Sequence, residues 1–254
     1  MARQVRSELT RRKILAAAID VFSEVGYAAA GWGTIIERTG MTKGALYHHF
    51  DSKEALASDI IDEGSETMVQ AFNNVCGSAS PALENMIHGT FAIAKVLSTD
   101  KVARAAEQLT AALSGFNEAT ARSCRNWVEA MAHQAQRAIA EGDLRPELDP
   151  GVVSATIVGA MYGARVLAVS ISGQRASEGL AEDLSGRLSQ LWGVLLPGIA
   201  TEESLPYFRQ FLAREAMRHA RSKRSANGLA ASVSAAGDAP ATDAPAINQA
   251  ILEN

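Results

Sequence analysis

Apolar residues recur at helical spacing along almost the whole chain, and glycine, proline and capping residues separate these stretches. No segment shows the alternation of apolar and polar residues that marks a half-buried strand. Alanine is abundant and aromatic residues make up 6% of the 254 residues, a composition that suits packed helices better than sheets. We therefore predict an all-α fold.

The breaks between the apolar stretches predict ten helices. The first ends at Gly26, and the next two are short segments that meet across Gly40, with Thr42 as the cap of the second. Ser52 caps the fourth helix, Asp149 and Pro150 begin a later one, and Leu196-Pro197-Gly198 ends the one after it. The predicted ranges are 7–25, 33–39, 43–50, 53 towards the seventies, 81–98, 101–113, 117–141, 150–172, 177–195 and 202–222.

Charge and composition divide the chain into three parts. Residues 1–53 carry eight lysines and arginines against five aspartates and glutamates, although the whole chain has a net charge of −4. A cationic head on an acidic body is typical of a nucleic-acid-binding module joined to a different domain, here residues 54–224. An anionic membrane would suit the same charge pattern. Residues 225–254 are rich in alanine, serine, glycine, aspartate and proline, and we predict that this tail is disordered.

Cysteine usage and hydropathy bear on the location of the protein. Cys76 and Cys124 lack the spacing of metal ligands and are too few for a disulfide framework, which favours a reducing compartment. The N-terminal segment is polar and basic, and no uncharged apolar run long enough to span a membrane follows it. We therefore expect a cytoplasmic protein without a membrane partner.

The short helix after Gly40 has the residues of a helix that reads DNA. Small residues at its start let the backbone approach a phosphate, and a threonine and a lysine beside them supply a hydroxyl and a charge. A tyrosine and a histidine near its far end can reach a phosphate or a base edge, and a lysine at the start of the next helix adds a second phosphate anchor. The expected DNA-binding residues here are Thr42, Lys43, Gly44, Ala45, Tyr47, His48 and Lys53.

Helix one, the segment Gly-x-x-Lys-Gly-Ala-Leu-Tyr-His-His-Phe at 40–50 and the following Ser-Lys-Glu-Ala-Leu resemble the DNA-binding domain of the TetR family of transcriptional repressors. The resemblance covers residues 7–60. It implies that Tyr47 and Lys53 contact the DNA backbone, while residues 42–45 and His48 face the major groove. The family usually opens its second helix with Thr-Thr or Thr-Ser. This chain reads Ala-Ala-Gly-Trp-Gly-Thr at 29–34, so Thr34 is the one backbone donor that we expect there.

Segments at 1–4, 100–105, 108–110 and 191–198, together with Trp127, are similar to the γ-butyrolactone receptors of actinobacteria, a subgroup of this family that regulates antibiotic production. The similarity implies a diffusible lactone or furan-type effector inside the C-terminal domain, with Trp127 in the pocket. Apolar positions on neighbouring helices are expected to line the same cavity, and two hydroxyls to bind a polar head group. The expected ligand-binding residues are Phe91, Leu109, Thr110, Trp127, Met131, Val158, Met161 and Tyr162.

A DNA-binding helix-turn-helix of this kind implies a homodimer. One helix-turn-helix reads too few base pairs to find an operator, so two copies must present their reading helices about 34 to 36 Å apart. The segments 150–172 and 177–195 are mostly apolar, and we expect them to form a four-helix interface with their mates. Arg165, inside the first of them, is expected to pair with an acidic residue. Ligand near Trp127 is expected to displace helices 81–98 and 101–113 and so change the spacing of the two readers.

The sequence carries no motif of a metal site or an enzyme. His88, His133 and His219 lack the spacing of a metal site, and the chain has no hydrolase, P-loop or dinucleotide fingerprint, so we expect no metal, no cofactor and no enzymatic activity. Two close alternatives stay open: a pseudo-receptor that binds other ligands, and a DNA-binding dimer without an effector. An enzyme with a degenerate reader domain is the third alternative.

Overall fold

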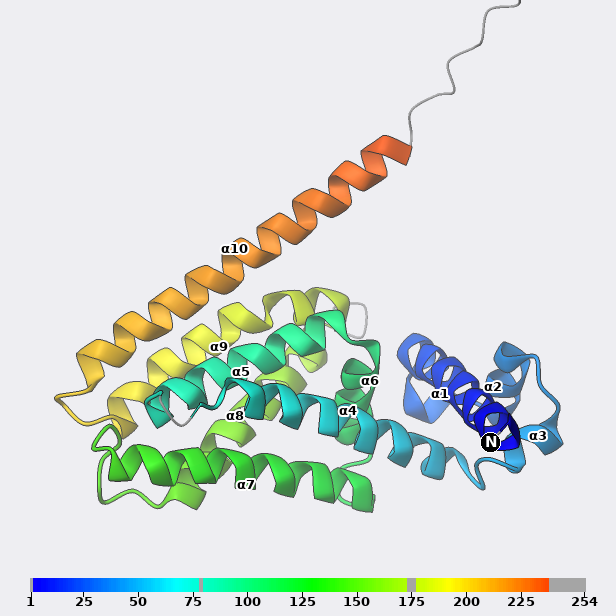
Figure 1. Cartoon of the computed structure of the whole chain (residues 1–254), viewed down its shortest axis with the longest axis horizontal. Coiled ribbons are helices and arrows are strands. Elements are labelled where there is room, and N and C mark those ends of the chain that lie inside the picture. The colour runs from blue at the N-terminus through cyan, green and yellow to red at the C-terminus, as the bar shows by residue number, and fades with distance from the viewer. Residues whose placement is uncertain (1, 78–79, 173–176, 238–254) are drawn as a thin grey trace, which may run out of the picture. The chain divides into compact units, whose positions relative to one another are not determined.

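The computed structural model of the chain describes residues 2–77, 80–172 and 177–237, which are almost entirely helical (Figure 1). Loops join the helices, and within this part of the chain an isolated bridge between Leu144 and Ala200 is the one β element. The all-α prediction is confirmed. The helices are α1 (Ala2–Ala29), α2 (Trp32–Thr39), α3 (Lys43–Tyr47), α4 (Lys53–Val75), α5 (Ala82–Thr99), α6 (Lys101–Ala112), α7 (Glu118–Ala140), α8 (Pro150–Ser172), α9 (Ser177–Ile199) and α10 (Leu205–Gly237).

The predicted capping residues begin the helices where we expected them. Thr42 and Ser52 each accept a hydrogen bond from the backbone amide three residues later, at 3.3 and 3.0 Å, which satisfies an amide of the first turn. The Asp149 carboxylate does the same for α8 at 2.9 Å. Gly40 has φ 64°, a left-handed conformation that ends α2 and turns the chain into α3. These local signals account for the helix-turn-helix of residues 32–47.

Helices α9 and α10 run past their predicted ends, whereas α1 is interrupted at Gly26 (φ 76°), where its end was predicted. Pro197 does not stop α9, because it lies in the last turn and Arg145 donates hydrogen bonds to the carbonyls of Pro197 and Ala200, at 2.9 and 3.1 Å. In α10 the helix continues to Gly237, so residues 225–237, which we expected to be disordered, are helical; alanine, abundant there, is the strongest helix former. The remaining tail, 238–254, lies outside the described residues. The described part of the chain divides into two units between Ala216 and Met217.

One buried cluster joins the first helices to α6. It holds Ile14 and Phe22 of α1, Leu46 of α3 and four apolar residues of α4, and three residues of α6 complete it. The α4 members are Leu56, Ala57, Ile60 and Ile61, and the α6 members are Ala105, Ala106 and Leu109. The first core therefore extends past the predicted domain boundary at residue 53, into α4. Because α6 supplies part of this core, the helix-turn-helix packs directly on a helix of the following domain.

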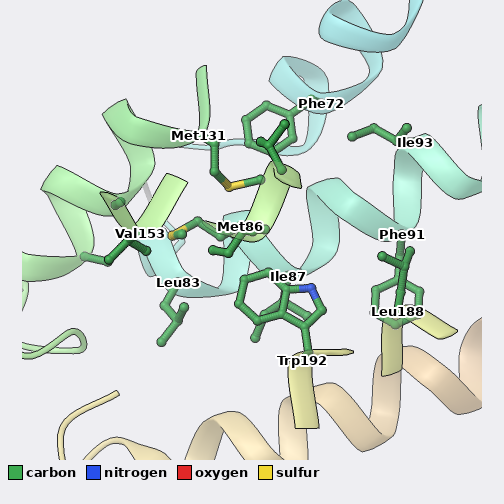
Figure 2. Close-up of a cluster of buried hydrophobic side chains, with 14 of the residues drawn as sticks. Phe72, Leu83, Met86, Ile87, Phe91, Ile93, Met131, Val153, Leu188 and Trp192 are labelled. Atoms are coloured by element: carbon green, nitrogen blue, oxygen red, sulfur yellow. The ribbon is translucent and has the colours of Figure 1, made fainter. Parts of the chain in front are cut away.

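A second cluster is built around α5 (Figure 2). Trp192 of α9 is fully buried beside Ile87, and its indole Nε1 donates a hydrogen bond to the Thr90 hydroxyl at 2.9 Å. A Cβ on Gly89 would lie 2.3 Å from the ring of Phe72, so α4 and α5 approach closely at this glycine. Helices α4, α5, α7, α8 and α9 thus share one core.

Helix α8 is long, apolar and poorly covered. The window Pro150–Leu167 is apolar enough to cross a membrane by length and composition, and 22% of it is buried. Val152, Val166 and Leu167 are 64%, 52% and 63% exposed, and Val194 on α9 is 79% exposed. Exposed apolar side chains grouped on neighbouring helices mark an interaction surface.

Candidate functional site

The predicted DNA-binding residues of α2 and α3 are accessible, whereas Ile35 and Leu46 on the same helices are fully buried. A Cβ at Gly44 would meet no atom within 4 Å, so the start of α3 is open to an approaching partner. The exposed members are Thr34, Thr42, Lys43, Gly44, Tyr47 and His48, and Ala45 is half-buried. The helix-turn-helix therefore buries its apolar side and presents its polar side.

Trp32 contacts Tyr47, the aromatic residue of this exposed set. Its ring meets the Tyr47 ring edge-on, with the centroids 5.5 Å apart, and the Lys43 Nζ lies 5.7 Å from the Tyr47 centroid. These contacts restrict Tyr47, whose side chain is still 43% exposed. Sequence reasoning missed Trp32 as a positioning residue. The available signal was that tryptophan stands where the resembled family opens its second helix with small hydroxyl residues.

Lys53 contacts its own chain. Its Nζ donates hydrogen bonds to the carbonyls of Tyr27, at 2.9 Å, and Ala30, at 3.0 Å, and lies 4.4 Å from the Tyr27 ring centroid. These carbonyls belong to the end of α1 and the turn before α2, where free carbonyls attract a cation. Two of the three ammonium hydrogens are thus engaged. Lys53 therefore links the start of α4 to the α1–α2 turn, and the third N–H of its ammonium group remains available to donate to a DNA phosphate.

We expect Lys53→Met to lower the free energy of unfolding by about 1–2 kcal/mol, because two hydrogen bonds from a charged group are lost. Chemical denaturation of the full chain measures this. Lys13→Met, on an exposed lysine of α1, is the matched control and should leave stability unchanged. Unchanged stability in Lys53→Met, together with weaker DNA binding, would instead assign Lys53 to a phosphate.

A small cavity of about 50 Å³ lies among helices α4 to α9, with mostly apolar walls. Five of the predicted ligand-binding residues line it: Trp127, Met131, Val158, Met161 and Tyr162. Sequence reasoning missed the other lining residues, namely Met68, Ile93, Leu97, Glu107, Arg165 and Leu184. Trp127 also packs edge-on against the ring of Phe72, with the two ring centroids 5.7 Å apart.

The other three predicted ligand-binding residues lie outside the cavity wall. Phe91 points towards α9 in Figure 2, where Leu188 lies. Leu109 packs in the first core, beneath the helix-turn-helix. It follows Glu107 by two residues, which places the two on opposite sides of α6. Thr110, one turn beyond Glu107, is buried but is not part of the wall.

Three polar side chains meet the cavity. Glu107 of α6 forms an ion pair with Arg165 of α8, which confirms the prediction that Arg165 has an acidic partner. Burial and the nearby Arg104 lower the pKa of Arg165 to about 10, so the guanidinium stays charged near neutral pH. Burial raises the pKa of Tyr162, whose hydroxyl contacts Ser123 and the free thiol of Cys124. The described residues contain no cluster of metal ligands.

Helices α4 and α6 connect the cavity to the reading helices. At Gly64 they touch so closely that a Cβ would lie 2.4 Å from the Ala106 Cβ and 2.8 Å from the Val102 carbonyl oxygen. After α6, the Asn117 side-chain amide donates to Glu54 and Ser58 near the start of α4, at 3.1 and 2.9 Å. Helix α4 is therefore held to α6 at Gly64 and to the start of α7 at Asn117.

Comparison with known proteins supports this arrangement. Residues 14–60 match the model of the bacterial regulatory proteins of the tetR family, and residues 80–201 match the tetracyclin repressor-like C-terminal domain. The chain is 32% identical over 247 residues to the A-factor receptor protein of Streptomyces griseus, covering 96% of this chain and 84% of that protein. This chain belongs to the TetR family. It is a transcriptional regulator with an N-terminal DNA-binding domain.

Solved structures of TetR proteins share the fold over most of this chain. A crystal structure of a γ-butyrolactone receptor, an ArpA-like protein, has a TM-score of 0.68 and 27% identity, and the match covers 84% of this chain and 99% of that one. The TetR protein CprB of Streptomyces coelicolor, solved with its biological operator sequence, has a TM-score of 0.66 at 27% identity and the same coverage. The predicted TetR resemblance is confirmed.

Proposed function

We propose that this TetR protein is a repressor that binds operator DNA as a dimer and releases it when a γ-butyrolactone-like molecule enters the cavity beside Trp127. Its resemblance to autoregulator receptors further suggests that it acts in the cytoplasm and controls antibiotic production. The similarity to an A-factor receptor and to a γ-butyrolactone receptor supports this effector class. The proposed DNA-binding domain is residues 1–53, with Thr34, residues 42–45, Tyr47 and His48 as contacts and Lys53 chiefly as a brace.

The proposal depends on one observation: α4 and α6 belong to the cavity wall and to the core of the DNA-binding domain at the same time. Met68 of α4 lines the cavity, while residues 56–61 of the same helix lie in the first core. On α6, Glu107 lines the cavity and Leu109 lies in the first core. A displacement of the wall therefore moves helices to which the reader is attached.

The size of the cavity makes such a displacement necessary. It measures about 50 Å³, whereas an engineered protein cavity that holds benzene measures about 150 Å³. A lactone with an alkyl chain is larger than benzene, so it enters only if the walls move apart. Ligand and operator then favour different positions of α4 and α6, which is the differential affinity that allostery requires.

A second copy of the chain is the proposed cover for the apolar surface of α8 and α9. An operator has two half-sites, and a dimer places one α3 helix at each of them, so the function requires a dimer. Within the described residues, Val152, Val166, Leu167 and Val194 are more than half exposed in one copy. Pairing these helices with their mates would form a four-helix interface.

We expect Leu167→Glu to give a monomer and to weaken operator binding by at least about a hundredfold, because it places an unpaired charge in an apolar interface. Light scattering coupled to gel filtration measures the mass of the protein. Phe116→Glu is the matched control, since Phe116 is similarly exposed, at 69%, but lies between α6 and α7. A Leu167→Glu variant that remains dimeric would contradict the proposed interface.

Gel shift with duplexes from the chain's own upstream region, with and without a synthetic alkyl γ-butyrolactone, tests the proposed function. We expect a shifted band that the lactone abolishes, and a higher melting temperature with lactone, because a ligand that binds the folded state stabilises it. Operator binding that no lactone affects would favour a dimer without an effector. Release by an antibiotic instead would favour a pseudo-receptor, and failure to bind any upstream duplex would contradict the repressor.

A further inference from the structure

The cavity contains one buried pair of opposite charges in otherwise apolar walls. The side chains of Glu107 and Arg165 are 9% and 18% exposed, and they are the charged members of the lining. Methionine, leucine, isoleucine, valine and tryptophan form most of the remaining surface. The cavity lining therefore carries no net charge, and it offers a bound molecule one negatively charged contact at Glu107 and one positively charged contact at Arg165.

Such a pair restricts the head group of a ligand. Arg165 has only hydrogen-bond donors and Glu107 only acceptors, so a molecule that touches both must carry an acceptor and a donor. Any group that separates the two charges without replacing their contacts leaves a buried charge uncompensated, which is strongly unfavourable. A carboxylate near Arg165 would also lie beside Glu107, and two buried carboxylates repel each other.

We propose that the Glu107–Arg165 pair makes the cavity selective for a neutral molecule with an apolar chain and a head group bearing both a hydrogen-bond acceptor and a donor. The same pair excludes the carboxylate that forms when a lactone ring opens. This inference rests on the proposed function, which makes the cavity the effector site. When water adds across the lactone ester, the ring carbon–oxygen bond breaks and a hydroxyl and a carboxylate form, with loss of a proton. Hydrolysis thus ends the signal without any change in the protein.

The test uses the full chain and two probes that differ only by ring opening. One is an alkyl γ-butyrolactone with a hydroxymethyl group, and the other is the sodium salt of its ring-opened hydroxy acid. Calorimetric titration near neutral pH gives both affinities. We expect the lactone to bind at least about tenfold more tightly than the acid, since a repulsion of a little over 1 kcal/mol suffices for that factor.

Glu107→Gln removes the negative charge and leaves Arg165 unpaired. A guanidinium forms strong two-point contacts with a carboxylate, so the acid should gain at least about tenfold in affinity and the preference should shrink or reverse. Glu118→Gln is the matched control, because Glu118 pairs with Arg125 on the surface, where the two side chains are 70% and 57% exposed. It should keep the wild-type preference.

If Glu107→Gln does not fold, the double variant Glu107→Gln/Arg165→Gln removes both charges and should no longer prefer the lactone. Equal affinity of the wild type for lactone and acid would overturn the inference. So would a preference that Glu107→Gln leaves unchanged, or one that the double variant retains. In all of these results a bound lactone leaves the proposed function standing. If the wild type binds neither probe, the proposed effector class fails, and the inference fails with it.

Discussion

Lys43→Ala and Tyr47→Ala are each expected to weaken operator binding by at least about a hundredfold, because a dimer loses the contact at both half-sites. Lys43 is exposed at the start of α3, and its ammonium lies over the Tyr47 ring. Fluorescence anisotropy with a labelled operator duplex measures the affinity. Lys43→Ala should also reduce the salt dependence of binding, because one cation fewer displaces counterions from each half-site.

The folded state should be little affected by either change. Lys43→Ala alters an exposed side chain, and Tyr47→Ala loses its edge contact with Trp32, which is about 1 kcal/mol. Lys95→Ala, on an exposed lysine of α5 far along the chain from the reader, is the control and should bind operator normally. Normal operator binding by both reader variants would show that α3 does not read DNA.

Gly64→Ala is expected to lower the free energy of unfolding by about 3 kcal/mol, at the upper end for an added methyl group in a packed core. The new Cβ would lie 2.4 Å from the Ala106 Cβ and 2.8 Å from the Val102 carbonyl oxygen. Backbone atoms cannot move aside as a flexible side chain can, so α6 must shift away from α4. Urea denaturation of the full chain measures the loss.

Gly33→Ala is the matched control for this substitution. A Cβ at Gly33, on the exposed side of α2, would meet no atom within 4 Å. Alanine is the better helix former, so stability should stay level or rise by up to about 1 kcal/mol. Equal losses at the two glycines would mean that the α4–α6 contact is not the cause.

Local chemistry made much of the fold predictable from the sequence. The caps Thr42 and Ser52 and the left-handed Gly40 act within a few residues of themselves, so they appear in the sequence as they do in the structure. The reader is predictable for the same reason, since its residues lie on one short segment. The prediction that Pro197 ends α9 was wrong. Arg145, more than fifty residues earlier in the chain, donates a hydrogen bond to the Pro197 carbonyl in the last turn of that helix.

The cavity was only partly predictable. The apolar residues of α7 were found because this helix carries an apolar stripe, and those of α8 because the whole helix is apolar, while Trp127 was implied by resemblance. Helix α6 has two buried sides, one against the DNA-binding core and one at the cavity, and its sequence does not distinguish them. Leu109 was therefore assigned to the cavity although it packs in the first core, and Glu107 was missed.

By itself, the sequence determined the all-helical architecture, most helix boundaries and the exposed reader, since caps and helical periodicity operate between residues that are close along the chain. Only the tertiary structure decided that Lys53 braces the α1–α2 turn, that Glu107 is the partner of Arg165, and that α4 and α6 serve both cores. Those facts depend on which sides of several helices meet, and that choice is made by packing across the whole domain.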